Sequence, residues 1–204
     1  MTNGPASTSN ERPTIVILGA SAEDPPPGLE PAFELADVHF APDGEALRTL
    51  MVDADALLSW GAPPGWLSGV WELADRLRWI HSASDGVDQL LFPALVTSDV
   101  LVTNARGVFD APIAEWAIGA ILAFATGLRT SILDTATGTW DGERSRGRVA
   151  GQRLLIVGPG PIGEATATCA RAFGMQVSAV GRSARDHHPV FGRELGPEDL
   201  HRAR

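Results

Sequence analysis

Residues 151–163 read Gly-Gln-Arg-Leu-Leu-Ile-Val-Gly-Pro-Gly-Pro-Ile-Gly, the pattern of a buried strand, a glycine turn and the start of a helix. Gly158 permits a tight bend, Gly160 lets a phosphate approach the backbone, and Gly163 lets the helix pack closely against the strand. A helical run and then a second strand, residues 175–180, come next. This strand–helix–strand context favours a dinucleotide-binding site over an ordinary tight turn.

The start of the predicted helix is where a pyrophosphate would lie. Backbone N–H groups in the first turn of a helix are free to bind an anion. Pro161 suits the first position of the helix, yet it removes one N–H group close to the expected pyrophosphate. The predicted phosphate-binding residues are Gly158, Gly160, Pro161, Ile162 and Gly163.

The residues after the second strand indicate which nucleotide is bound. At this position an acidic residue normally accepts hydrogen bonds from a ribose hydroxyl and repels a 2′-phosphate. Here the chain reads Gly181-Arg182-Ser183-Ala184-Arg185, with no carboxylate before Asp186. Arg182, Ser183 and Arg185 offer a cradle for a phosphate dianion, so the sequence predicts NADP, with NAD as the alternative cofactor. The competing interpretation is a pair of solvated arginines, because all 16 basic residues are arginine.

Composition excludes several classes of partner. The 204 residues carry a formal net charge of -9, which argues against a nucleic acid or an anionic membrane as a partner. The apolar run from Ile113 to Leu128 is too short to span a membrane and is interrupted by Glu115. The single cysteine, Cys169, cannot form an intrachain disulfide and fits a reducing cytoplasm. No cysteine or histidine cluster has the spacing of metal ligands, so no metal site is expected.

The first half of the chain alternates short apolar runs with helical patterns, which predicts a mostly parallel sheet with helices on both faces. The expected strands are 14–18, 56–60, 78–82 and 100–103, and the expected helices are 44–52 and 67–77. A further helix is predicted from about Ala111 to Leu128. This helix is apolar on most sides, so it should be buried on more than one side, at a domain interface or against a dimer partner. A polar connector is expected from Thr137 to Ala150.

Three motifs together resemble the D-isomer-specific 2-hydroxyacid dehydrogenase family. They are Trp79-Ile80-His81-Ser82-Ala83-Ser84-Asp85-Gly86-Val87-Asp88, then Asn104 followed by Gly107 and Ala114-Glu115, and finally the glycine turn. The resemblance implies an α/β protein with a flavodoxin-like substrate-binding domain, whose first part is 13–103. It also implies an incomplete Rossmann NAD(P)-binding domain over 104–204.

The resemblance also implies a function, the interconversion of a small 2-keto acid and its D-2-hydroxy acid with NADPH favoured as hydride donor. It implies that the backbone amides of Ser84, Asp85, Gly86 and Val87 hold the substrate carboxylate, which suits a loop whose glycine frees the backbone. The competing interpretation is a strand-to-helix turn capped by Asp85. The helix at 111–128 would form a homodimer interface.

The chain departs from the family pattern beyond the glycine turn. Members use an arginine, a glutamate and a histidine in the later half of the nucleotide domain, and none of the three maps onto this sequence. His187, His188 and His201 are expected to be solvated loop residues. We therefore expect the 204-residue chain to be inactive alone. One alternative is a short protein that binds nucleotide or dimerises without catalysis, and another is an unrelated Rossmann oxidoreductase.

Overall fold

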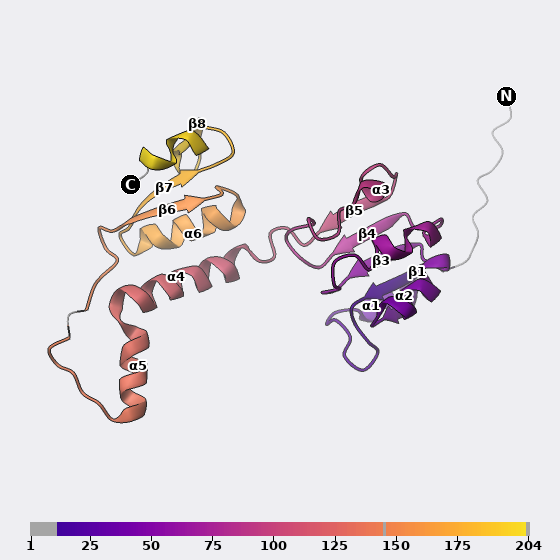
Figure 1. Cartoon of the computed structure of the whole chain (residues 1–204), viewed down its shortest axis with the longest axis horizontal. Helices are drawn as coiled ribbons and strands as arrows, with labels where there is room; N and C mark the ends of the chain where they lie inside the picture. Colours follow the sequence, from indigo (N-terminus) through magenta and orange to yellow (C-terminus); the bar gives the residue numbers. More distant parts are fainter. Residues whose placement is uncertain (1–11, 145, 203–204) are drawn as a thin grey trace. The chain divides into compact units, whose positions relative to one another are not determined.

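The computed structural model describes residues 12–144 and 146–202, and the chain divides into two compact units between Arg106 and Gly107 (Figure 1). Residues 203 and 204, the end of the predicted second domain, and Ser145 in the predicted connector lie outside the described residues. Each unit contains its own sheet. The two units are described separately below.

The first unit contains a five-stranded sheet in the order β2-β1-β3-β4-β5, with every neighbouring pair parallel. This is the flavodoxin-like strand order, as predicted. Its elements are β1 (Thr14–Leu18), α1 (Glu30–Leu35), β2 (Asp37–Ala41), α2 (Gly44–Leu50), the 3-10 helix η1 (Met51–Asp53), β3 (Ala56–Ser59), the 3-10 helix η2 (Ser68–Leu73), β4 (Trp79–Ser82), α3 (Pro93–Val96) and β5 (Leu101–Asn104).

Two parts of the first unit differ from the sequence prediction. The strand β2 and the short helix α1 were not predicted. The helix expected at 67–77 is a shorter 3-10 helix, in which Val70 N–H donates to Leu67 O and Ala74 N–H to Trp71 O. Gly69 lies inside this run and is a poor helix former, which accounts for the shortening.

The core of the first unit lies on one face of the sheet, where strand residues pack against α2, η1, η2 and α3. Its fully buried members include Val16, Leu57 and Ile80 from three adjacent strands. On the opposite face, Trp79 and Leu101 are paired across β4 and β5, and both are exposed. The sequence predicts helices on both faces of the sheet, but among the described residues no helix covers this second face at β4 and β5.

The buried carboxylate of Asp55 joins three strands at the amino edge of this sheet. Its Oδ2 accepts a hydrogen bond from Thr14 N–H at 2.9 Å, and its backbone oxygen accepts one from Arg78 N–H at 2.9 Å. The guanidinium groups of Arg76 and Arg78 lie 3.3 Å and 3.1 Å from the carboxylate. The hydrogen bond from Thr14, aided by the two arginines and opposed by burial, lowers the pKa of Asp55. Asp55 thereby helps to fix the register of β1, β3 and β4.

The second unit contains a four-stranded sheet in the order β6-β7-β9-β8. The pairs β6–β7 and β7–β9 are parallel, whereas β8 runs antiparallel to β9. The hairpin of β8 and β9 was not predicted, and it adds a third parallel strand without a crossover helix. The elements are α4 (Asp110–Thr126), α5 (Leu128–Thr137), β6 (Arg153–Val157), α6 (Pro161–Ala172), β7 (Gln176–Val180), β8 (Arg185–His188), β9 (Gly192–Leu195) and the 3-10 helix η3 (Pro197–Arg202).

The long helix α4 confirms the helix predicted from Ala111, although it ends at Thr126 because Gly127 adopts a left-handed φ of 72°. One side of α4 packs against α6 through Ile118 and its neighbours. The other side carries Trp116 and Phe124, which are 76% and 82% exposed. Within the described residues, α4 is therefore covered on one side only, and the predicted burial of this helix on more than one side is not seen.

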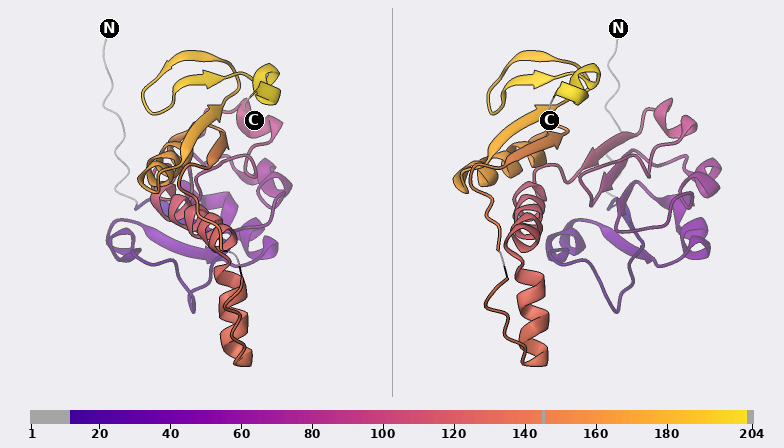
Figure 2. Two further views of the ribbon diagram at one scale, coloured as in Figure 1. Left: turned by 90° about the vertical axis from the view of Figure 1, so that its left-hand side faces the viewer. Right: turned by 60° about the vertical axis from the view of Figure 1, so that its left-hand side comes forward.

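Helix α5 extends away from the sheet of the second unit in both views of Figure 2. Among the described residues, no single helix is long and apolar enough to cross a membrane. The pair α4 and α5 meets the length and composition criteria together, but the two helices are bent by 68°.

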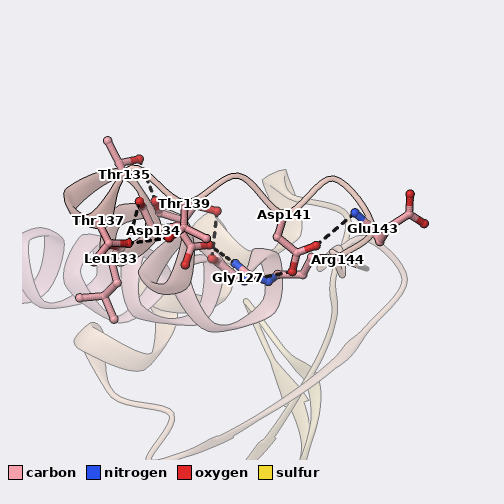
Figure 3. Close-up of polar contacts among 10 residues, drawn as sticks. Gly127, Leu133, Asp134, Thr135, Thr137, Thr139, Asp141, Glu143 and Arg144 are labelled. Atoms are coloured by element: carbon pink, nitrogen blue, oxygen red, sulfur yellow. Dashed lines mark hydrogen bonds and ion pairs between the residues drawn. The ribbon is translucent and has the colours of Figure 1, made fainter.

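The segment after α5 folds back along that helix (Figure 3). The guanidinium group of Arg144 contacts the carboxylate of Asp134, and its Nη2 lies 3.2 Å from Asp141 Oδ2. The hydrogen bond with Asp134 is the main reason why the pKa of Arg144 is raised. These contacts give the predicted polar connector a defined path at its beginning.

Candidate functional site

The glycine turn between β6 and α6 has the geometry that its sequence predicts. Gly158 has a φ of 104°, which an L side chain rarely adopts, and its N–H donates to Val180 O at 2.9 Å. A Cβ on Gly163 would lie 2.3 Å from Gly158 O and 3.1 Å from Ile156 Cγ2. The helix therefore packs so closely on the strand that only glycine fits at residue 163.

The space above the turn is open. A Cβ on Gly160 would meet no heavy atom within 4 Å, so the backbone of this residue is accessible to a ligand. Gly160 is the N-cap of α6, with Pro161 at the first helical position. The N–H groups of Ile162 and Gly163 lie in the first turn, where helices have no backbone acceptor for them. The turn thus offers backbone donors and the positive end of a helix dipole to an anion.

The residues predicted to hold a 2′-phosphate follow β7. Arg182 and Ser183 are exposed in the link between β7 and β8. Arg185 begins β8, and its Nε lies 3.8 Å from Oε2 of the buried Glu194 on β9. The charge of Arg185 is therefore partly compensated. Sequence reasoning did not single out Glu194, because the hairpin that places it beside the end of β7 was not predicted.

The loop after β4 lies at the carboxyl edge of the first sheet and is held by hydrogen bonds to and from neighbouring segments. Ala83 N–H donates to Ser59 O, Ala105 N–H donates to Ser84 O, and the side chain of Asn104 donates to Asp85 O. Within the loop, Ser84 Oγ donates to Gly86 O at 2.7 Å. Carboxyl edges of parallel sheets are the usual place for ligands in such folds.

The backbone donors of this loop are available. Within residues 12–144 and 146–202, no group accepts a hydrogen bond from the N–H groups of residues 84–87. Gly86 does not have a positive φ, and a Cβ on it would meet only Asp88 Oδ2, at 3.4 Å. Backbone strain therefore does not require glycine here. Instead, the loop presents adjacent free N–H groups, an arrangement that suits a carboxylate.

One histidine prediction was wrong. His188 is buried, and its Nδ1 accepts from the N–H groups of Val190 and Phe191 at 3.2 Å and 3.4 Å. Its Nε2 lies 3.5 Å from Glu164 Oε1. The residue closes the β8–β9 hairpin, which explains why it is not solvated. His187 and His201 are exposed as expected.

Among residues 12–144 and 146–202, the other titratable residues do not form a metal centre. His81 lies on β4, where its Nδ1 is 2.9 Å from Thr103 Oγ1. In the part of the chain that the structure describes, no group of three or more histidine, cysteine, aspartate or glutamate side chains could hold a metal ion. The chemistry that the two loops support is therefore anion binding by backbone donors.

Comparison with known proteins identifies the second unit. Residues 118–201 match the family model described as "D-isomer specific 2-hydroxyacid dehydrogenase, NAD binding domain". This match supports a nicotinamide dinucleotide as the ligand of the glycine turn.

Individual relatives extend the likeness to most of the chain. It is 30% identical to a glyoxylate reductase of Thermococcus kodakarensis, over 92% of this chain and 58% of that protein. It is 32% identical to a D-3-phosphoglycerate dehydrogenase of Methanocaldococcus jannaschii, over 53% of this chain and 21% of that protein. The chain thus spans less than two thirds of the length of these relatives.

A solved structure agrees with the sequence matches. A D-isomer specific 2-hydroxyacid dehydrogenase family protein from Aeromonas salmonicida subsp. salmonicida A449 is 26% identical, with a TM-score of 0.74. The match covers 94% of this chain and 60% of that one. The strand orders, the glycine turn and these matches show together that the chain resembles the D-isomer specific 2-hydroxyacid dehydrogenase family, and that its second unit resembles the NAD-binding domain of that family.

Proposed function

We propose that the chain forms part of a nicotinamide-dependent oxidoreductase that interconverts a small 2-keto acid and its D-2-hydroxy acid. The observation that carries this proposal is the glycine turn, where Gly163 is sterically required and Gly160 is open to a ligand. In this proposal residues 13–103 are the first part of a substrate-binding domain. Residues 104–204 are part of an NAD(P)-binding domain.

The two loops would hold the two reactants. A bound nicotinamide cofactor supplies or accepts the hydride. The N–H groups of Ile162 and Gly163 would bind its pyrophosphate, and those of residues 84–87 would bind the substrate carboxylate. Because these donors belong to the backbone, they are fixed before the ligands arrive and need little reorganisation.

Turnover also needs a proton donor for the alkoxide that develops at the reacting carbonyl. The histidine beside the carboxylate loop, His81, is hydrogen-bonded to Thr103. His188 is enclosed in its hairpin. The arginine, glutamate and histidine that the family resemblance implies do not map onto this sequence. We therefore propose that the 204-residue chain binds ligands but does not turn over by itself.

The preferred cofactor in this proposal is NADPH. Arg182 and Ser183 are exposed next to the end of β7, and Arg185 is close by. Changing Arg182 to aspartate should shift the ratio of NADPH to NADH affinity toward NADH, since it replaces attraction to the 2′-phosphate by repulsion. An unchanged ratio would rule out the phosphate cradle.

We also propose that α4 mediates a homodimer. Trp116 and Phe124 lie on its uncovered side, and Leu128, Ile132 and Leu133 of α5 are also exposed. Large apolar side chains that are exposed in this number are typical of a protein interface. Sedimentation of the natural chain should show a dimer that Phe124→Arg dissociates.

The proposal also includes a cytoplasmic location, with which a free thiol at Cys169 is consistent.

The test of the main proposal is calorimetric titration of the chain with NADPH and NADH, with turnover of glyoxylate and hydroxypyruvate measured alongside. Nucleotide binding without turnover would support the proposal, but it would equally suit a short binding protein without catalytic partners. Those two are separated by adding the later half of a relative's nucleotide domain in fusion. Recovered turnover would favour the dehydrogenase. No nucleotide binding would contradict both.

A further inference from the structure

Glu194 lies on β9 and carries a buried carboxylate beside the end of β7 in the second unit. Glu194 is 2% exposed, and its Oε2 accepts no hydrogen bond from the described residues. Its nearest cationic group is Arg185 Nε, at 3.8 Å. Leaving a carboxylate buried without hydrogen bonds is costly, so this oxygen has capacity for a donor that the chain does not supply.

The position of this carboxylate is defined by Gly181, the residue directly after β7. A Cβ on Gly181 would lie 1.6 Å from Glu194 Oε1 and 2.7 Å from Glu194 Cδ. It would also lie 3.3 Å from Pro159 Cγ, in the glycine turn. The carboxylate of Glu194 therefore occupies the space into which a side chain at residue 181 would project.

That space is where dinucleotide-binding folds usually place an acid. The acid accepts hydrogen bonds from a ribose hydroxyl of NAD and disfavours a 2′-phosphate. Gly181 cannot supply it. We infer that Glu194 supplies this carboxylate from the neighbouring strand β9 and is a specificity-determining residue for the cofactor, an inference that rests on the proposed function.

With Glu194 in this role, two sets of side chains with opposite effects determine whether NADPH or NADH binds more tightly. Arg182 and Ser183 attract a 2′-phosphate, whereas Glu194 accepts from a ribose hydroxyl and repels that phosphate. The side chain of Arg185, which lies against Glu194 Oε2, is 63% exposed and can move aside for a ligand. The natural chain should therefore bind both nucleotides, with a modest preference for NADPH.

The test is calorimetric titration of the natural chain and Glu194→Gln with NADH and NADPH. The variant should bind NADH about tenfold more weakly, equivalent to about 1.4 kcal/mol. It should bind NADPH more tightly, because a repulsive charge is gone. Asp186→Asn is the matched control, since it removes an exposed charge from the same hairpin. That control should leave both affinities unchanged.

A second variant separates a role in binding from a role in folding. In Gly181→Asp combined with Glu194→Ala, the carboxylate moves from β9 to the end of β7. Gly181 does not have a positive φ, so it can carry a side chain once Glu194 is shortened. The double variant should regain the NADH affinity that Glu194→Ala alone loses. Thermal unfolding of each variant shows whether the hairpin is intact.

The possible outcomes distinguish a failure of this inference from a failure of the proposed function on which it rests. If the natural chain binds neither nucleotide, the proposed function fails and the inference fails with it. If the natural chain binds them but Glu194→Gln changes neither affinity, or weakens both equally, the inference alone is overturned. Loss of NADH affinity in Glu194→Gln with recovery in the double variant supports it.

Discussion

The glycine turn after β6 and the loop after β4 present backbone donors in similar ways but are held in place differently. Both follow the carboxyl end of a strand that pairs in parallel with its neighbour, and both present backbone N–H groups without an acceptor among the described residues. In the glycine turn, local sterics impose the geometry, because a Cβ at Gly163 would collide with Gly158 O. In the loop after β4, hydrogen bonds from Asn104 and from the backbone of Ala83 and Ala105 impose it. A site can thus be built from required glycines or from distant hydrogen bonds.

The largest effect is expected from Gly163→Ala. The added Cβ would lie 2.3 Å from a backbone oxygen, so α6 must move away from β6. Overpacking of this kind costs about 2–3 kcal/mol, and the shift should also abolish nucleotide binding. Hydrogen exchange in urea, read separately for each unit, measures the loss.

Gly160→Ala is the matched control for this variant. Its Cβ meets nothing within 4 Å, so the second unit should keep its stability while nucleotide affinity falls. If Gly163→Ala unfolds no more readily than Gly160→Ala, close helix packing does not determine the turn.

The contrast between the two loops explains how much of the site could be predicted. The roles of Gly158 and Gly163 depend on residues within the same short segment, so the sequence order alone predicts them. The loop at 84–87 depends on Ser59 and Asn104, which are far away in sequence. Nothing local marks it, and only its resemblance to a known family singled it out.

The same reasoning applies to the fold. Strands β1, β3, β6 and β7 are mostly apolar runs, and β4 alternates buried with more exposed residues, so these strands could be predicted. The sequence of β2, Asp37–Ala41, alternates polar and apolar residues beside a short helix and gives a weaker signal. The β8–β9 hairpin is mostly polar, and its core contact comes from Phe191, which packs with Ile156, Ala167 and Ala179. A tertiary contact of that kind has no periodic signature.

The second prediction tests whether the register of the first sheet supports the loop after β4. Asp55→Asn should destabilise the first unit by about 2 kcal/mol, because hydrogen bonds to a charged partner contribute about 1.5–3 kcal/mol. The amides of Ala83 and Ala105, whose hydrogen bonds hold the loop at 84–87, should exchange faster, while the second unit stays unchanged. Hydrogen exchange at neutral pH measures both effects.

The loss in Asp55→Asn should depend on pH. The pKa of Asp55 is lowered in the folded state, so its contribution is present above the unfolded pKa, about 4. It disappears as the pH falls through the folded pKa. The difference between the natural chain and Asp55→Asn should therefore shrink below about pH 4. Asp53→Asn is the control, since its contact with Arg76 is exposed and 3.8 Å long, and it should have little effect at any pH. A pH-independent difference would show that charge is not the reason.

A smaller effect is expected from Asn104→Ala, which removes the hydrogen bond to Asp85 O. Loss of one such bond should cost about 1 kcal/mol, concentrated in residues 84–87. Amide chemical shifts of these residues, followed during titration with glyoxylate, should show weaker binding than in the natural chain. Ser98→Ala removes a hydrogen bond to Leu95 O elsewhere in the same unit and should leave the titration unchanged. Equal effects of the two variants would mean that Asn104 has no special part in the loop.

The smallest effect, expected from Gly86→Ala, makes the comparison of the two loops decisive. Gly86 does not have a positive φ, and the added Cβ meets only the exposed carboxylate of Asp88 at 3.4 Å, which can move. The stability of the first unit should change by less than about 0.5 kcal/mol, since alanine also restricts the unfolded chain. Urea unfolding followed by hydrogen exchange measures the change beside that of Gly163→Ala. The contrary result is that Gly86→Ala destabilises the first unit as strongly as Gly163→Ala destabilises the second. That result would show that the lack of a side chain at glycine determines both loops. Hydrogen bonds from Asn104 and its neighbours would then not be what holds residues 84–87.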